Sequence, residues 1–297
     1  MKVAMTGSSG LIGTALRASL RGDGHEVQRL VHGAPDGPDQ VRIDARVPID
    51  PGLFTDVDVV VNLAGAGVGD HRWTPAYKKT IRQSRLKTTS GLVKALQSAT
   101  PRPRTLISAS AIGYYGVDNG DTRLSESAPA GSDFLGLVSR DWEGAAAAAS
   151  PAGVRTVLIR TGLVLAADGG ALAPMLKLFR LGLGGRLGSG QQYWSTIAME
   201  DEVRAIRFLM ANRDAAGAYN LTGPEPATNA EVTRQLGKAL RRPTLLPVPG
   251  FALKLALGEF ASGILGSARV VPDRLLEAGF NFHHPSLTSQ LRPVVSD

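Results

Sequence analysis

Three glycines at intervals of three residues follow the first apolar segment of the chain, at Gly7, Gly10 and Gly13. The first permits a tight turn, the second lets backbone N–H groups approach a phosphate, and the third lets the next helix pack closely on its strand. A helix that begins near Gly10 also points the positive end of its dipole at an anion. The spacing therefore predicts a site for the pyrophosphate of a dinucleotide. The same turn supplies three further expected cofactor contacts, Ser9, Leu11 and Ile12.

The second apolar segment, residues 26–31, indicates which dinucleotide to expect. Its position one helix after the glycines favours a nucleotide site over the alternative, an ordinary glycine turn. A site selective for NAD usually carries Asp or Glu near the end of this strand, whereas the first acid here is Asp36, in the following loop. Arg29 and His32, with Val31 between them, would attract a 2′-phosphate, which favours NADP over NAD. For His32 the alternative is a solvated loop residue.

Other candidate cofactor contacts follow later strands. Asp44 is expected to face the adenine, and the segment Leu63, Ala64 and Gly65 is expected to line the middle of the cofactor. Arg85, one helix further on, could reach a phosphate, and an arginine on a helix surface is the alternative reading of it.

Hydroxyl groups are the candidates for proton transfer, because Ser110, Tyr114 and Tyr115 follow the end of one predicted strand. A positioned side chain can polarise a carbonyl or act as a general acid or base. For both tyrosines, core packing with a satisfied hydroxyl is the alternative.

Arg186 and Gln191 belong to a glycine-rich stretch whose exposed N–H groups could hold a substrate phosphate or sugar. For this stretch a mobile lid without a ligand is the alternative.

Alternating strands and helices must position these residues. Predicted strands cover residues 3–5, 26–31, 41–43, 57–63, 104–108 and 154–160, and predicted helices cover residues 11–21, 75–98 and 134–149. This order indicates a doubly wound parallel α/β sheet with helices on both faces. Later segments predict helices over residues 200–211, 228–240, 251–265 and 272–278 and a strand over 218–221. Thr74 and Thr228 are predicted N-caps, the second in a capping box with Glu231.

Composition narrows the class of protein. The 297 residues contain no cysteine, which excludes disulfides, zinc–thiolate sites and cysteine nucleophiles, and no metal is expected. No segment suits a signal peptide or a membrane span, so we expect a cytoplasmic protein without a membrane partner. The net charge is +7, but the basic residues are spread along the chain without interleaved aromatic residues, and a small-molecule substrate is expected rather than nucleic acid.

The chain resembles the short-chain dehydrogenase/reductase superfamily, in its extended or atypical branch. The motifs that carry this resemblance are residues 6–13, 62–65, 108–110 and 160–162. More narrowly, it resembles the epimerase-family proteins, often called nucleoside-diphosphate-sugar epimerase-like. That likeness covers nearly the whole chain, at residues 72–73, 84–85, 113–116, 142–143, 182–185, 188–190, 272–275 and 279–280.

The resemblance implies a Rossmann domain that binds NADP over residues 1–165, which also receives later segments at about 195–225. A smaller lobe would cover residues 166–297, with a helical tail of unassigned function at about 245–294. It also implies a homodimer through the helices at 75–98 and 134–149. The cofactor contacts that it adds are Ser108, Thr161, Gly162 and Leu163.

The usual catalytic pair of the superfamily, a tyrosine with a lysine four residues later, is absent from this sequence. Phe134 and Val138 stand at those positions, and none of the five tyrosines has a lysine four residues on. Two hypotheses therefore remain. One is an NADP-dependent oxidoreductase or epimerase-like enzyme acting on a carbonyl or nucleotide-sugar-type substrate through Ser110, Tyr114 or Tyr115. The other is a non-catalytic NADP(H)-binding redox sensor or regulator, for example in cell division.

Overall fold

A seven-stranded parallel sheet forms the centre of the protein in a computed structural model that describes residues 1–44 and 46–295. The strand order is β11-β7-β5-β4-β1-β2-β3, and every neighbouring pair is parallel. This is the doubly wound Rossmann arrangement that the sequence predicts. The strands are β1 Lys2–Thr6, β2 Glu26–Val31, β3 Gln40–Arg42, β4 Val59–Asn62, β5 Thr105–Ala111, β7 Arg155–Thr161 and β11 Gly217–Leu221.

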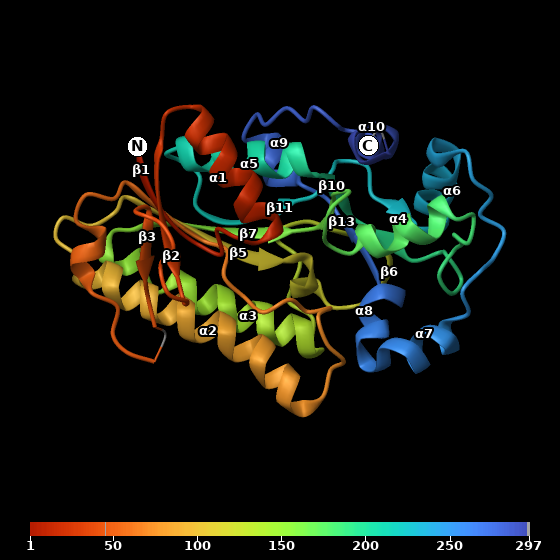
Figure 1. Ribbon diagram of the computed structural model, residues 1–297, viewed down its shortest axis with the longest axis horizontal. Coiled ribbons are helices and arrows are strands. Elements are labelled where there is room, and N and C mark those ends of the chain that lie inside the picture. The colour runs from red at the N-terminus through yellow and green to blue at the C-terminus, as the bar shows by residue number, and fades with distance from the viewer. Residues whose placement is uncertain (45, 296–297) are drawn as a thin grey trace.

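Two layers of helices cover the sheet (Figure 1). Helices α1 (Leu11–Gly22) and α5 (Met199–Ala211) lie on one face, and α2 (Pro75–Ser98) and α3 (Phe134–Ala147) lie on the other. Successive strand residues point to opposite faces, so Val3 joins the core under α1 and α5 while Ala4 joins the core under α2 and α3. The buried apolar side chains of the strands therefore pack against both helix layers.

Side-chain caps fix where the predicted helices begin. The Thr74 hydroxyl accepts the backbone N–H of Tyr77 at 3.2 Å at the start of α2. The Thr228 hydroxyl accepts the N–H of Glu231 at 3.3 Å at the start of α6 (Asn229–Leu240). Both predicted N-caps are confirmed, because each side chain satisfies a donor that the first turn leaves free.

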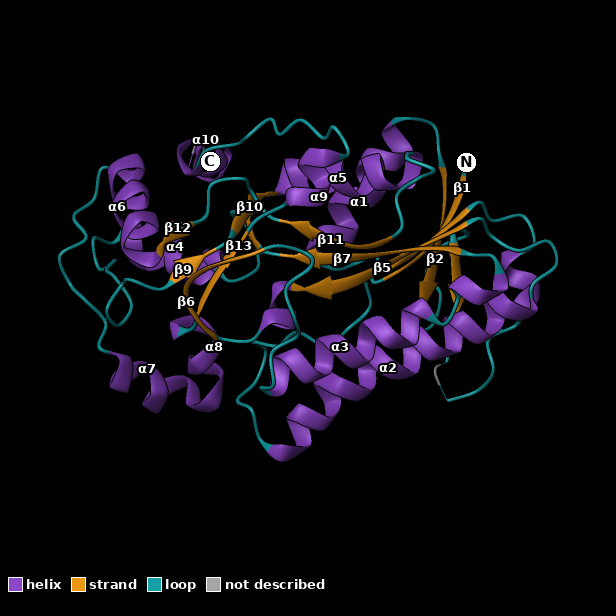
Figure 2. Cartoon of the chain, turned by 180° about the vertical axis from the view of Figure 1, so that it is seen from behind, coloured by secondary structure: helices purple, strands orange, loops and turns teal. Residues whose placement is uncertain are grey.

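A second group of elements extends the molecule beyond the carboxyl ends of the strands (Figure 2). Three two-stranded sheets belong to it, pairing β8 (Leu163–Leu165) with β10 (Thr196–Ala198), β6 (Asp118–Leu124) with β13 (Ser267–Val270), and β9 (Tyr193–Trp194) with β12 (Ala227–Thr228). Helices α4 (Leu172–Arg180), α6 and α10 (Leu287–Val295) enclose an apolar core of their own. The remaining helices are α7 Gly250–Leu257, α8 Ala261–Leu265 and α9 Asp273–Glu277, with short 3-10 turns η1 Pro51–Phe54, η2 Ile112–Tyr115, η3 Ser150–Ala152 and η4 Gly258–Phe260.

Several elements differ from the sequence-based prediction. The helix predicted over 251–265 is broken at Gly258, whose φ of +64° separates α7 from η4 and α8. Strand β6 and helices α4 and α10 were not predicted, since β6 is mostly polar and α10 contains Pro293. No helix in the described part of the chain is long and apolar enough to cross a membrane.

Candidate functional site

The glycine turn after β1 leaves no room for side chains. Gly7 has a φ of +66°, and a Cβ on it would lie 2.6 Å from the backbone of Leu63 at the end of β4. A Cβ on Gly13 would collide with the carbonyl oxygen of Gly7, while Gly10 is the N-cap residue of α1. The turn therefore brings α1 against two strand ends and directs its free N–H groups outward, which fits a dinucleotide pyrophosphate.

A cavity of about 680 Å³ opens beside this turn, at the carboxyl ends of β1, β2 and β4. Six predicted cofactor contacts line it: Gly7, Ser9, Val31, His32, Ala64 and Gly65. Helix α2 adds polar residues that the sequence analysis missed: Thr80, Gln83, Ser84, Lys87 and Thr88. Their spacing of three and four residues places them on one helix face, which is the signal that could have identified them.

The charge of this cavity suits a phosphate. His32 and Lys87 line it, and no Asp or Glu is among its lining residues. Arg29 lies next to the turn rather than in the lining, and its Nε donates to the Ser8 hydroxyl at 3.3 Å. Its guanidinium is also 4.0 Å from Asp39. Lys87 of α2 therefore adds a positive charge to the basic residues that were expected near the end of β2.

Three predicted cofactor contacts have partners within the protein, and their contact with the cofactor stays a prediction. Arg85 turns into the protein, where its Nη1 donates to the carbonyls of Ala66 at 2.9 Å and Ile81 at 3.0 Å. Burial lowers the pKa of its guanidinium to about 10, and its role is to hold the loop after β4. Asp44 is paired with Arg46, with N–O distances down to 2.7 Å. Ser108 is fully buried and accepts the Asn62 side-chain amide at 3.2 Å.

The other predicted contacts lie at the same edge of the sheet, mostly within the protein. Leu63 and Ile12 pack against the core under α1 and α5, and the Leu11 side chain lies against Gly169 and Gly170. The Thr161 hydroxyl donates to the Glu202 carboxyl at 2.8 Å. The N–H groups of Gly162 and Leu163 donate to the carbonyls of Leu221 and Ser195, at 2.9 and 2.8 Å.

A buried ion pair lies behind the ends of β5 and β7. Arg160 and Glu143 are 4% and 7% exposed, and the guanidinium makes two hydrogen bonds of 2.8 Å to the carboxylate. Ser110 donates to the same carboxylate at 2.6 Å. Arg160 also donates to the Tyr115 hydroxyl at 2.9 Å, and that hydroxyl donates to Asn220 at 2.7 Å. The network joins α3, β5, β7 and β11.

The three candidate proton-transfer residues differ in whether their hydroxyls take part in this network. The hydroxyls of Ser110 and Tyr115 are both used inside it, and burial raises the pKa of Tyr115 to about 12. Both hydroxyls therefore have partners within the protein, and their direct contact with substrate stays a prediction. Tyr114 is only partly buried, its ring lies 3.5 Å from the Arg160 guanidinium, and its hydroxyl makes no hydrogen bond to the described residues.

The positions of the missing catalytic pair lie in an apolar cluster. Val138 is buried with Trp73 and Ile81, and Phe134 packs edge-on against Trp73 with ring centroids 5.1 Å apart. Phe260, from η4, completes the cluster. No side chain at either position can transfer a proton, as the sequence predicts.

Hydrogen bonds from other parts of the C-terminal lobe hold the glycine-rich loop that follows α4. The Arg186 carbonyl accepts the N–H of Val248 at 2.8 Å, and the N–H of Leu187 donates to Asn229 at 2.8 Å. The Arg186 side chain is exposed and points to the Ser189 carbonyl at 3.5 Å, and Gln191 is exposed beside it. Their expected contact with a substrate stays a prediction.

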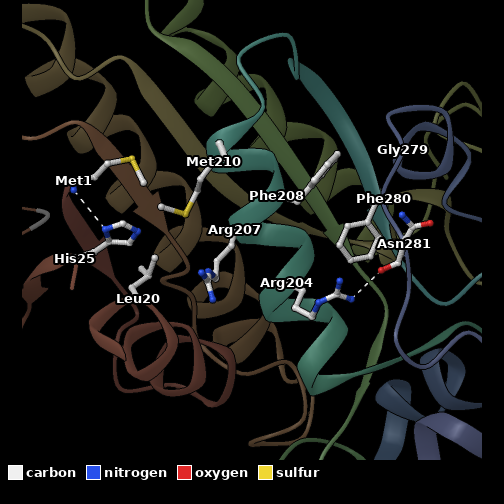
Figure 3. Close-up of a pocket in the computed structure, with 11 residues that line it drawn as sticks. Met1, Leu20, His25, Arg204, Arg207, Phe208, Met210, Gly279, Phe280 and Asn281 are labelled. Carbon is white, nitrogen blue, oxygen red and sulfur yellow. Dashed lines mark hydrogen bonds between the residues drawn. The ribbon is translucent and has the colours of Figure 1, made fainter. Parts of the chain in front are cut away.

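A second cavity, of about 480 Å³, lies at the opposite edge of the sheet, before β1 and β2 (Figure 3). Two arginines line it, and both already have partners. Arg207 is paired with Asp23, and Arg204 donates to Asp201 at 2.9 Å and to the Asn281 carbonyl at 2.8 Å. The glycine turn opens at the other edge, so the 680 Å³ cavity is the candidate cofactor site.

Comparison with known proteins agrees with this geometry. Residues 3–222 match the model of the NAD dependent epimerase/dehydratase family, and residues 248–294 match a domain of unknown function (DUF1731). Epimerase family protein Mb2239 of Mycobacterium bovis is 46% identical over 97% of this chain and 96% of its own. The crystal structure of human epimerase family protein SDR39U1 with NADPH has a TM-score of 0.93 at 32% identity, covering both chains completely. A nucleoside-diphosphate sugar epimerase from Corynebacterium glutamicum has a TM-score of 0.83 at 34% identity, covering all of this chain and 59% of that one.

Proposed function

This chain belongs to the NAD dependent epimerase/dehydratase family, and from that premise we propose that it binds NADP(H) and acts as an oxidoreductase. The substrate class is a carbonyl or nucleotide-sugar-type compound. The observation that carries the proposal is the crowded glycine turn beside a cavity without acidic residues. The NADPH in the structure of human SDR39U1 supports the same cofactor.

The residues around the turn fit this cofactor. Gly7, Gly10 and Gly13 would hold the pyrophosphate, and His32 and Lys87 would hold the 2′-phosphate. When bound, the dinucleotide supplies or accepts the hydride.

Tyr114 is the residue that we assign to proton transfer. Its free hydroxyl would donate a proton to the substrate oxygen when a carbonyl is reduced, and would accept that proton in the reverse direction. Arg160 holds a permanent positive charge against the ring, at 3.5 Å. Ser110 and Glu143 keep Arg160 in place, so they position the site without touching the substrate.

Reversing the charge of Lys87 is expected to weaken NADPH binding about tenfold and NADH binding much less, because only NADPH carries the 2′-phosphate. The measurement is a fluorescence titration of Lys87→Glu with each cofactor. Lys94→Glu is the matched control, since Lys94 lies on the same helix and does not line the cavity. Equal losses for both cofactors would contradict the assigned phosphate contact.

Removing the Tyr114 hydroxyl is expected to lower turnover about 100-fold with the NADPH dissociation constant unchanged, since it removes one proton donor and no cofactor contact. The assay follows NADPH oxidation by Tyr114→Phe with aldehydes, ketones and nucleoside-diphosphate sugars. Tyr193→Phe is the matched control, because Tyr193 also packs against an arginine, Arg269, at 5.2 Å. Unchanged turnover of Tyr114→Phe would exclude it as the proton donor.

A second candidate function, a non-catalytic NADP(H) sensor or regulator, is favoured by one observation. Phe134 and Val138 fill the positions of the catalytic pair with an apolar cluster. This candidate predicts cofactor binding without turnover of any member of the same substrate panel, and clear turnover would exclude it.

A further inference from the structure

Helices α4, α6 and α7 form the end of the molecule that lies away from the N-terminus (Figures 1 and 2). Exposed apolar side chains are concentrated in this part of the chain. We call residues 177–186 and 238–255 the basic apolar end. Eleven large apolar side chains are exposed in the described part of the chain, and seven of them belong to this end. They are Leu178, Leu181, Leu183, Leu245, Leu246, Phe251 and Leu255, each at least 50% exposed.

The two segments form one surface. The N–H of Val248 donates to the Arg186 carbonyl at 2.8 Å. A Cβ on Gly185 would collide with the carbonyl of Leu246, so the two backbones lie in direct contact there. A Cβ on Gly182 would lie 3.8 Å from the ring of Pro243, at ordinary van der Waals distance. The exposed leucines of the loop after α4 therefore adjoin those between α6 and α7.

All charged residues of these two segments are basic. The end carries seven basic residues and no Asp or Glu: Lys177, Arg180, Arg186, Lys238, Arg241, Arg242 and Lys254. The other 26 Lys and Arg residues of the chain equal its 26 Asp and Glu residues in number, so the end accounts for the net charge of +7. In residues 1–44 and 46–295, none of the seven forms an ion pair with a carboxylate.

Helix α7 lacks the buried face that a surface helix normally has. None of its eight residues is buried, although all but Gly250 and Lys254 are apolar. The Leu255 carbonyl accepts a hydrogen bond from Arg72 at 3.0 Å, which ties the helix to the loop before α2. A helix that is apolar on its exposed side indicates an interaction surface.

We propose that the basic apolar end docks on an anionic lipid surface, with its leucines and Phe251 at the headgroup boundary and its seven basic residues on the headgroups. An interfacial anchor combines these two kinds of residue. A second copy of the chain is disfavoured, because a two-fold contact would set seven cations against the same seven. This proposal departs from the expectation of no membrane partner, which rested on the lack of a spanning segment.

The test is co-sedimentation of the full chain with vesicles. We expect binding to phosphatidylcholine vesicles that contain about 30% phosphatidylglycerol, little binding to pure phosphatidylcholine, and an about tenfold loss on raising the salt to about 0.5 M. The double variants Phe251→Ser/Leu255→Ser and Arg241→Glu/Arg242→Glu should each lose about tenfold. The control Leu276→Ser/Arg213→Glu changes an exposed leucine and an arginine outside this end and should bind normally.

The affinity of each variant for NADPH, which does not depend on this surface, reports whether the variant is folded. Absent binding to anionic vesicles, or equal binding to both vesicle types, would overturn the proposal. Self-association through this end, or saturable binding of polyglutamate without vesicle binding, would assign the surface to another occupant and would also overturn it.

Discussion

Replacing Arg160 with methionine is expected to lower the free energy of unfolding by about 3–5 kcal/mol, because it leaves the buried Glu143 carboxylate without its cation. Arg160 makes both of the guanidinium bonds to Glu143 and one to the Tyr115 hydroxyl. Methionine fills much of the volume but donates no hydrogen bond. The measurement is urea unfolding followed by tryptophan fluorescence and circular dichroism.

Two further variants make this expectation specific to the buried pair. Arg82→Met breaks the α2–α3 ion pair with Asp141, of the same length at 2.8 Å but with Arg82 51% exposed, and should cost less than about 1 kcal/mol. The double variant Arg160→Met/Glu143→Gln removes both charges and should be more stable than Arg160→Met alone. A loss below about 1 kcal/mol for Arg160→Met, or additive losses in the double variant, would contradict the argument.

The glycine turn and the central sheet could be predicted because their signals are local. Gly7, Gly10 and Gly13 are defined by spacing, and the parallel strands by short apolar segments between helices. The buried network could not be predicted in the same way. Tyr115 and Asn220, which share a hydrogen bond, are separated by 105 residues, and only the packing of β5, β7 and β11 brings them together.

Residue type alone also could not distinguish two cations of α2. Arg85 has the right charge and lies on the right helix, but its guanidinium bonds the carbonyls of Ala66 and Ile81 inside the protein. Lys87, two residues later, reaches the cavity instead. Two residues along a helix correspond to about half a turn, so the helix face, which the packing of α2 decides, determines which of them meets the cofactor site.

Replacing Glu202 with glutamine is expected to change how stability depends on pH. Glu202 is fully buried on α5, one carboxyl oxygen accepts the Thr161 hydroxyl at 2.8 Å, and the other has no hydrogen-bond partner among residues 1–44 and 46–295. Burial raises the pKa of this carboxyl from 4.5 to about 8. Below pH 4.5 the carboxyl is protonated in both states, and its contribution to stability is fully present. As the pH rises toward 8, only the unfolded state ionises, so that contribution is lost at about 1.4 kcal/mol per pH unit.

Glutamine cannot ionise, so Glu202→Gln removes this loss. We therefore compare the free energies of unfolding of the variant and the wild type. Between pH 5.0 and 7.5 their difference should shift by about 3 kcal/mol in favour of the variant. A pH-independent effect of the amide would not change this shift. Urea unfolding at intervals across this range measures it. Glu231→Gln is the control, because hydrogen bonds from Arg234 lower the pKa of that exposed carboxyl, and its contribution changes only at lower pH. Parallel pH curves for Glu202→Gln and the wild type would show that the buried carboxyl is ionised at neutral pH, and Thr161 would then be, among the described residues, the one hydrogen-bond donor to a buried charge.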